Sequence, residues 1–247
     1  MRFTLQMPTD KVRQPDEFLT PEALAEMGRA AETAGFSACY VTEHPIPEDG
    51  WLAQGGHHAL DPFVALSFLA AATERIRLQT HLLVLPYRNP FLTAKSVASL
   101  DVLSRGRVIA GVGAGYLESE FRALGVPFAR RNEMTDEAIR VMREVWNGES
   151  VTLEGEGFRA DGNTALPRPA QRPAPPIWVG GNSHRAIRRA DELGDGWLPF
   201  PAPPAMARRV GTAALGGKED LAKRLAYAGE HAEKGGGAEP LEGGASP

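Results

Sequence analysis

The chain has a single cysteine, Cys39, and therefore cannot form an intrachain disulfide. It also has no basic excess: the formal net charge is −4 and the pI is about 5.9, which argues against nucleic-acid binding. No cluster of lysine or arginine indicates a membrane surface, and the sequence beginning MRFTLQMP has no signal-peptide character. We therefore expect a cytoplasmic protein that acts on a small-molecule substrate, with neither nucleic acid nor a membrane as partner.

The order of apolar segments predicts the fold class. The 247 residues suffice for one large α/β domain. A short apolar segment followed by a helical pattern recurs six times, with strands expected at 3–6, 36–41, 76–85, 108–112, 177–179 and 196–198. This alternation is typical of a parallel sheet covered by helices. Since a TIM barrel has eight such units, we expect a (β/α)8-type barrel that ends after about six.

The pattern changes over residues 147–176. A small hairpin is indicated near 151–159, and the prolines of 167–176 cannot belong to a central strand. We interpret the segment as an insertion before the fifth strand, within a domain that spans residues 1–234. Residues 235–247 are rich in Gly, Ala and Pro, and we expect them to be disordered.

Histidines are the first candidates for chemistry, because ligands of parallel α/β folds bind at the carboxyl ends of strands. His44 directly follows the second strand, where an imidazole can exchange a proton near pH 7 and Glu43 could tune it, although a structural histidine fits the pattern equally well. His81 lies inside the third strand, and composition alone favours a hydrogen-bonded core histidine. His57 and His58 have no further ligand at suitable spacing, so we expect them to be solvated and predict no metal site.

Two glycine runs follow later strands. The run at 111–115 lacks the last glycine of the dinucleotide fingerprint, where Tyr116 stands, so it is not a Rossmann motif. Small residues there would let a flat ring or a backbone approach, although a tight turn needs the same residues. The run GGNS at 180–183 leads into a helix whose amides and dipole would attract an anion. Ordinary helix capping is the alternative interpretation.

Four segments together resemble the bacterial luciferase-like monooxygenase superfamily, and in particular its branch that depends on the deazaflavin coenzyme F420. They are AGFSACYVTEH (34–44), RIRLQTHLLVLPYRNP (75–90), LDVLSRGRVIAGVGAGYLESEFRALGVPF (100–128) and PPIWVGGNSHRAIRRADELGDGWLP (175–199). They stand in the expected order and cover much of the chain. The proline-dense segment is similar to the family's insertion.

The resemblance implies a TIM barrel that holds a flavin-type ring against a bulge in the third strand, with a cis peptide between His81 and Leu82. It places Gly113 and Ala114 beside the ring, and it makes His44 the histidine that faces it. The cofactor's phosphate would meet the loop residues Gly180, Gly181, Asn182 and Ser183.

The implied activity is hydride transfer between coenzyme F420 and a small organic substrate, with His44 as acid or base. An FMN-dependent monooxygenase that uses reduced flavin and oxygen is the alternative within the superfamily. The superfamily's sugar-phosphate dehydrogenases have a glutamate where Tyr116 stands, which argues against that substrate class. Because the chain ends near the expected seventh strand, an inactive barrel fragment is a third interpretation, and a homodimer is left open.

Overall fold

A parallel sheet dominates the computed structural model, which describes residues 2–235, 242 and 243. Its strand order is β1-β2-β3-β5-β8-β9-β10, and β4 pairs with β5 beyond the end of β3. The strands are β1 (Thr4–Gln6), β2 (Ala38–Val41), β3 (Arg77–Thr80), β4 (Leu83–Val84), β5 (Val108–Gly113), β8 (Ile177–Gly180), β9 (Gly196–Leu198) and β10 (Glu242–Gly243). The six predicted strands are thus confirmed and form a half-barrel.

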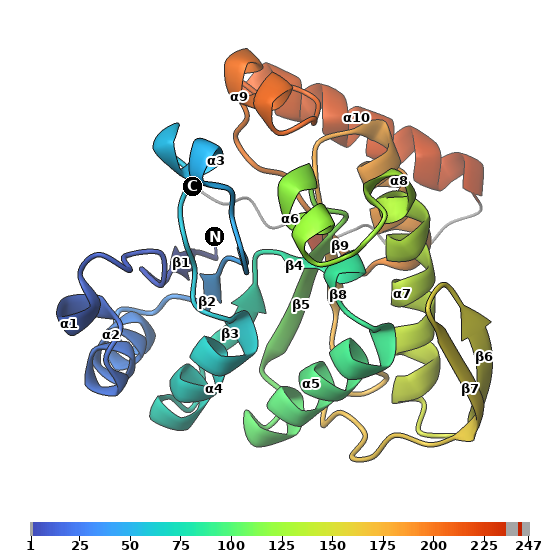
Figure 1. Cartoon of the computed structure of the whole chain (residues 1–247), viewed down its shortest axis with the longest axis horizontal. Helices are drawn as coiled ribbons and strands as arrows, with labels where there is room; N and C mark the ends of the chain where they lie inside the picture. Colours follow the sequence, from blue (N-terminus) through green and yellow to red (C-terminus); the bar gives the residue numbers. More distant parts are fainter. Residues whose placement is uncertain (1, 236–241, 244–247) are drawn as a thin grey trace.

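Helices surround this sheet (Figure 1). The α-helices are α1 (Pro15–Phe18), α2 (Pro21–Thr33), α3 (Asp49–Ala53), α4 (Pro62–Ala72), α5 (Pro90–Leu103), α6 (Glu118–Ala123), α7 (Arg131–Trp146), α8 (His184–Leu193), α9 (Pro204–Arg209) and α10 (Lys218–Gly235). Two 3-10 helices, η1 (Leu85–Tyr87) and η2 (Phe128–Arg130), complete the set. Of these, α1, α3 and α9 were not predicted, because they are single turns inside segments that read as loops. No helix in the described part is long and apolar enough to cross a membrane.

Side-chain caps fix where several helices begin. Thr20, Asp61, Asn89 and Ser183 each accept a hydrogen bond from a main-chain N–H in the first turn of α2, α4, α5 and α8 respectively. In the first three helices a proline fills the first turn, where its missing N–H costs nothing. These caps hold each helix start at a defined place relative to the strand before it.

The hydrophobic core lies between the sheet and its helices. Every residue of β2 and β5 is buried, as expected for strands covered on both faces. At the amino-terminal end of the sheet the guanidinium of Arg107 donates five hydrogen bonds, to the main-chain oxygens of Ala70, Thr73, Ile76 and Ser104 and to the Thr73 hydroxyl. Arg107 thereby joins the end of α4 to the turn after α5.

The segment predicted to be an insertion contains the antiparallel hairpin β6 (Val151–Gly155) and β7 (Phe158–Asn163), which confirms the predicted hairpin. The hairpin packs on α7 at the edge of the molecule (Figure 1). The predicted disordered tail, 235–247, falls almost entirely outside the described residues. Within it, Gly235 ends α10, and Glu242 and Gly243 pair in parallel with β9.

Candidate active site

The third strand is interrupted near the carboxyl end of the sheet. The peptide bond between His81 and Leu82 is cis, as the resemblance implied, and pairing with β5 resumes in β4. Just before the interruption the Thr80 hydroxyl donates to the main-chain oxygen of Gly111 at 2.7 Å. Both His81 and Leu82 then line a cavity at this end of the sheet.

Leu82 explains why glycine occurs on two neighbouring strands. A Cβ atom on Gly113 would lie 2.7 Å from Leu82 Cδ1, and one on Gly180 would lie 2.4 Å from the same atom. Both distances are well inside van der Waals contact. The two glycines therefore make room for the side chain of the interrupted strand. For the run at 111–115, the sequence had suggested a direct approach by a ring or a backbone.

Two adjoining cavities occupy this end of the sheet. The larger contains about 820 Å³ of empty space including its open mouth, and the second about 720 Å³. Both are bounded by the same six residues, which are Leu82, Gly113, Gly115, Tyr116, Phe200 and Val210. An elongated ligand can therefore extend from one cavity into the other.

The larger cavity contains His44, which the sequence singled out. The ring of His44 is surrounded by those of Trp51, His57 and Tyr116, with centroids 4.6, 4.8 and 6.1 Å away. His57, predicted to be solvated, is instead half-buried in the cavity wall, because α3 and the loop after it fold back over His44. The prediction for His57 was therefore wrong.

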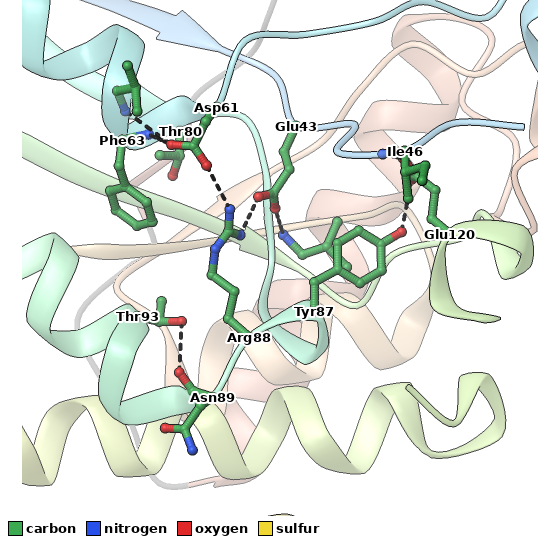
Figure 2. A network of polar contacts seen from close by, with 12 residues as sticks. Glu43, Ile46, Asp61, Phe63, Thr80, Tyr87, Arg88, Asn89, Thr93 and Glu120 are labelled. Carbon is green, nitrogen blue, oxygen red and sulfur yellow. Dashed lines mark hydrogen bonds and ion pairs between the residues drawn. The ribbon is translucent and has the colours of Figure 1, made fainter. Parts of the chain in front are cut away.

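Glu120 of α6 is buried beneath this group of rings. Its carboxylate accepts from the main-chain N–H of Ile46 at 3.2 Å and from the Tyr87 hydroxyl at 3.0 Å, and it lies 3.2 Å from His44 Nδ1. Figure 2 shows Tyr87, Ile46 and Glu120 meeting at this point. Glu120 was not predicted from the sequence, since an acidic residue in a short helix usually faces water.

Glu43 does not contact His44, contrary to the expectation that it could tune the histidine. Its carboxylate pairs with Arg88 and accepts from the main-chain N–H of Val84 at 2.7 Å, and Arg88 also pairs with Asp61 at 3.2 Å (Figure 2). Burial raises the pKa of Glu43, an effect that the charge of Arg88 opposes. Glu43 therefore anchors the interrupted strand, whereas His44 contacts Glu120.

Burial shifts the pKa of several groups around the larger cavity. It lowers the pKa of His81 to about 4. It also lowers the pKa of His57, helped by the neighbouring charge of His44. Burial and then the charge of Glu120 raise the pKa of Tyr116 to about 12 and raise that of Tyr87 as well. At neutral pH, His57, His81, Tyr87 and Tyr116 are consequently uncharged.

The second cavity is bordered by the start of α8. Gly180 and Gly181 line it, and Gly181 has φ +118°, a conformation that favours glycine. Ser183 also lines the cavity and caps the helix by accepting from the N–H of Ala186 at 3.2 Å. The amino-terminal end of a helix attracts negative charge, so this cavity suits an anionic group.

Three arginines add positive charge to the second cavity: Arg131, Arg185 and Arg189. Arg185 pairs with Glu133 at 2.9 Å, and Arg189 pairs with Asp136, so both are held against α7. None of the three was predicted, because two lie on the predicted helix after the GGNS run and one at the start of α7, where arginine is common on solvated faces.

Asn182 differs from the other predicted phosphate contacts. Its side chain lines neither cavity: it donates to the main-chain oxygens of Phe200 and Ala213 and accepts from the N–H of Phe200 at 3.1 Å. Asn182 thus joins the loops that follow β8 and β9. Its prediction as a phosphate ligand needs correction, because a fully buried amide finds its partners in the protein.

The remaining predicted residues are brought together. His44, His81, Leu82 and Gly113 line the larger cavity, and Ala114, Gly180, Gly181 and Ser183 line the second. In the larger cavity the buried nitrogens His57 Nε2 and His81 Nδ1 have no hydrogen-bond partner within the described part of the chain. A polar planar ring there, with an anionic tail toward α8, fits this arrangement.

A parallel half-barrel with its ligand cavities at the carboxyl ends of the strands defines a protein of the TIM-barrel class. The chain belongs to the luciferase-like monooxygenase family, whose model matches residues 1–227. The family recognised from the sequence is thereby confirmed.

Individual relatives agree with the family. The chain is 34% identical to an uncharacterised protein of Mycobacterium bovis, over 75% of this chain and 69% of that protein. It is 32% identical to an F420-dependent glucose-6-phosphate dehydrogenase of Nakamurella multipartita, over 83% of this chain and 60% of that protein. The crystal structure of the monooxygenase RslO1 from Streptomyces bottropensis matches with TM-score 0.76 and 26% identity, over 98% of this chain and 70% of that one.

Proposed function

We propose that this protein is an oxidoreductase that binds coenzyme F420 and transfers hydride between it and a small organic substrate. The observation that carries the proposal is the pair of adjoining cavities, one containing His44 and the other bordered by the start of α8. The 32% identical F420-dependent dehydrogenase supports the choice of cofactor. Bound F420 would supply the redox chemistry through its deazaflavin ring.

The protein's residues have separate tasks in this proposal. His81 and Leu82 support the ring, while Gly180, Gly181 and Ser183 hold the cofactor's phosphate. His44 gives or takes the proton that accompanies hydride transfer at the substrate's oxygen. The rings of Trp51, His57 and Tyr116 surround His44 and exclude water from the site of proton transfer.

A second candidate is a monooxygenase that uses reduced FMN and oxygen. The 26% identical monooxygenase RslO1 favours it, and FMN also carries a phosphate that the second cavity would accept. The two candidates differ in which ring system binds.

Separate titrations with F420 and with FMN test the proposal, followed by cofactor absorbance and by thermal shift of the protein. We expect F420 to saturate the protein in the micromolar range and FMN to produce no comparable shift. Binding of FMN alone would replace the proposal with the monooxygenase. Binding of neither cofactor would overturn both and favour a chain without activity.

A further inference from the structure

Glu120 connects three parts of the chain that are distant in sequence. It is 1% exposed, and its two oxygens divide their partners. Oε1 accepts from the main-chain N–H of Ile46, at 3.2 Å. Oε2 is 3.0 Å from the Tyr87 hydroxyl and 3.2 Å from His44 Nδ1. One carboxylate therefore links the loop after β2 to η1 and α6.

This arrangement determines which nitrogen of His44 carries the proton. A carboxylate can only accept hydrogen bonds, so the nitrogen facing it, Nδ1, must donate. A neutral imidazole has one N–H, and its other nitrogen then has a free electron pair. Since His44 lines the larger cavity, Nε2 is the nitrogen left for a ligand.

We infer that Glu120 is a positioning residue that holds His44 in the Nδ1–H tautomer and thereby makes Nε2 the proton acceptor of the larger cavity. The inference rests on the proposed role of His44 in proton transfer. When a substrate hydroxyl loses its proton, the O–H bond breaks, an Nε2–H bond forms, and the imidazole becomes a cation. That cation lies beside the Glu120 carboxylate, 3.2 Å from it, and is stabilised there.

The other groups around His44 do not determine which of its nitrogens carries the proton. Trp51 is neutral, burial and the charge of His44 lower the pKa of His57, and Tyr116 has a pKa raised to about 12. Their rings pack against His44 but make no hydrogen bond to it within the described residues. Glu120 supplies the contact that distinguishes the two ring nitrogens.

Glu120→Gln makes a sharp test, because it keeps the shape of the side chain. The N–H of Ile46 can only donate, so it should hold the new amide oxygen, and the amide NH2 should face His44. Nδ1 would then have to accept, and the ring proton would move to Nε2. We expect the neutral ring of His44 to be the Nδ1–H tautomer in the wild type and the Nε2–H tautomer in Glu120→Gln.

The readout is 15N NMR of histidine-labelled protein without cofactor, at about pH 8.5, where ordinary imidazoles are neutral. His44→Asn identifies the signals of His44 by difference. The chain has six histidines, and unchanged signals from the five others would show that Glu120→Gln is folded. Tyr87→Phe is the matched control: it removes one donor to Glu120 but leaves the carboxylate, so the Nδ1–H tautomer should persist.

An Nε2–H tautomer in the wild type, or no change of tautomer in folded Glu120→Gln, would overturn the inference. Because these spectra need no cofactor, their outcome is independent of whether F420 binds. With cofactor and substrate, Glu120→Gln should lower kcat by about a hundredfold and leave the cofactor Kd unchanged. An unchanged kcat in a variant whose tautomer has switched would contradict the catalytic part of the inference.

Discussion

His81 shows how a side chain can be costly for stability and still suit a binding site. It lies at the interruption of the third strand, and its Nδ1 is buried without a partner among the described residues. The sequence favoured a hydrogen-bonded core histidine there, and that expectation was wrong. A ligand that donates to Nδ1 would satisfy the buried nitrogen, which is consistent with the ring position that the resemblance implied.

The lowered pKa of His81 predicts a dependence of stability on pH. The unfolded chain binds a proton near pH 6.5 but the folded protein only near pH 4, so acid favours the unfolded state in this interval. The free energy of unfolding should fall by ~2 to 3 kcal/mol from His81 alone as the pH drops from 6.5 to 4.

Urea denaturation at several pH values, on the wild type and on His81→Gln, measures this contribution. The variant should lose that part of the acid sensitivity. His58→Gln is the matched control, because His58 is exposed and its replacement should leave the wild-type dependence intact. Equal slopes for His81→Gln and the wild type would contradict the prediction.

The site residues that could be predicted from the sequence differ from those that could not in whether their position along the chain marks them. His44 and the GGNS run could be predicted because each directly follows a strand, where ligands bind in this class of fold. Glu120 contacts His44 across 76 residues of sequence and Tyr87 across 33, and only the folded chain brings them together. A distance of that kind leaves no local pattern in the sequence.

At the scale of the elements, the sequence predicted which strands exist and in what order better than it predicted their boundaries. The six predicted strands are all present in the structure, because each is a short apolar segment that a break in the pattern ends. The third was predicted as one strand over 76–85, whereas it is two, β3 and β4, separated at His81 and Leu82. An apolar run carries no sign of such an interruption, because both halves remain buried.

The hydrogen bonds of Arg107 predict how much this side chain contributes to the stability of the fold. Its guanidinium donates five hydrogen bonds to the end of α4 and the neighbouring turns, and an ammonium group has only three hydrogens to donate. Arg107→Lys should therefore leave buried carbonyls unpaired and lower the free energy of unfolding by ~2 to 4 kcal/mol. Urea denaturation at neutral pH measures the loss.

The control for this prediction is Arg105→Lys, since Arg105 is exposed and its change should alter stability by less than about 0.5 kcal/mol. Arg107 lies at the amino-terminal end of the sheet, away from both cavities, so folded Arg107→Lys should keep the wild-type affinity for cofactor. A loss of affinity without a loss of stability would contradict this division between the two ends of the sheet.

At the scale of the whole molecule, the two cavities are built from different parts of the sheet. His44 comes from the end of β2, and the anion site from β8 and α8. They meet only through shared lining residues such as Leu82 and Tyr116. Changes at His44 should therefore affect mainly chemistry, and changes at the anion site should affect mainly cofactor binding.

Ser183→Asp and His44→Asn test this separation together. Aspartate can cap α8 as serine does, but its charge would repel a phosphate, so the cofactor Kd should rise by at least about tenfold. Ser183→Asn, a neutral cap, is the matched control and should bind nearly as the wild type. His44→Asn should lower kcat while leaving the Kd unchanged. If Ser183→Asp and Ser183→Asn raised the cofactor Kd equally, the negative charge could not be the cause.

The adjacency of Glu43 and His44 has a consequence for anyone who redesigns this protein. The two side chains have different partners: Glu43 pairs with Arg88, and His44 contacts Glu120, which also accepts from the Tyr87 hydroxyl. A deletion or insertion of one residue in β2 would shift both side chains relative to the sheet and move each away from its present partner. Loop grafts and chimaeras should therefore be joined outside β2, so that the register of the strand in the sheet is preserved.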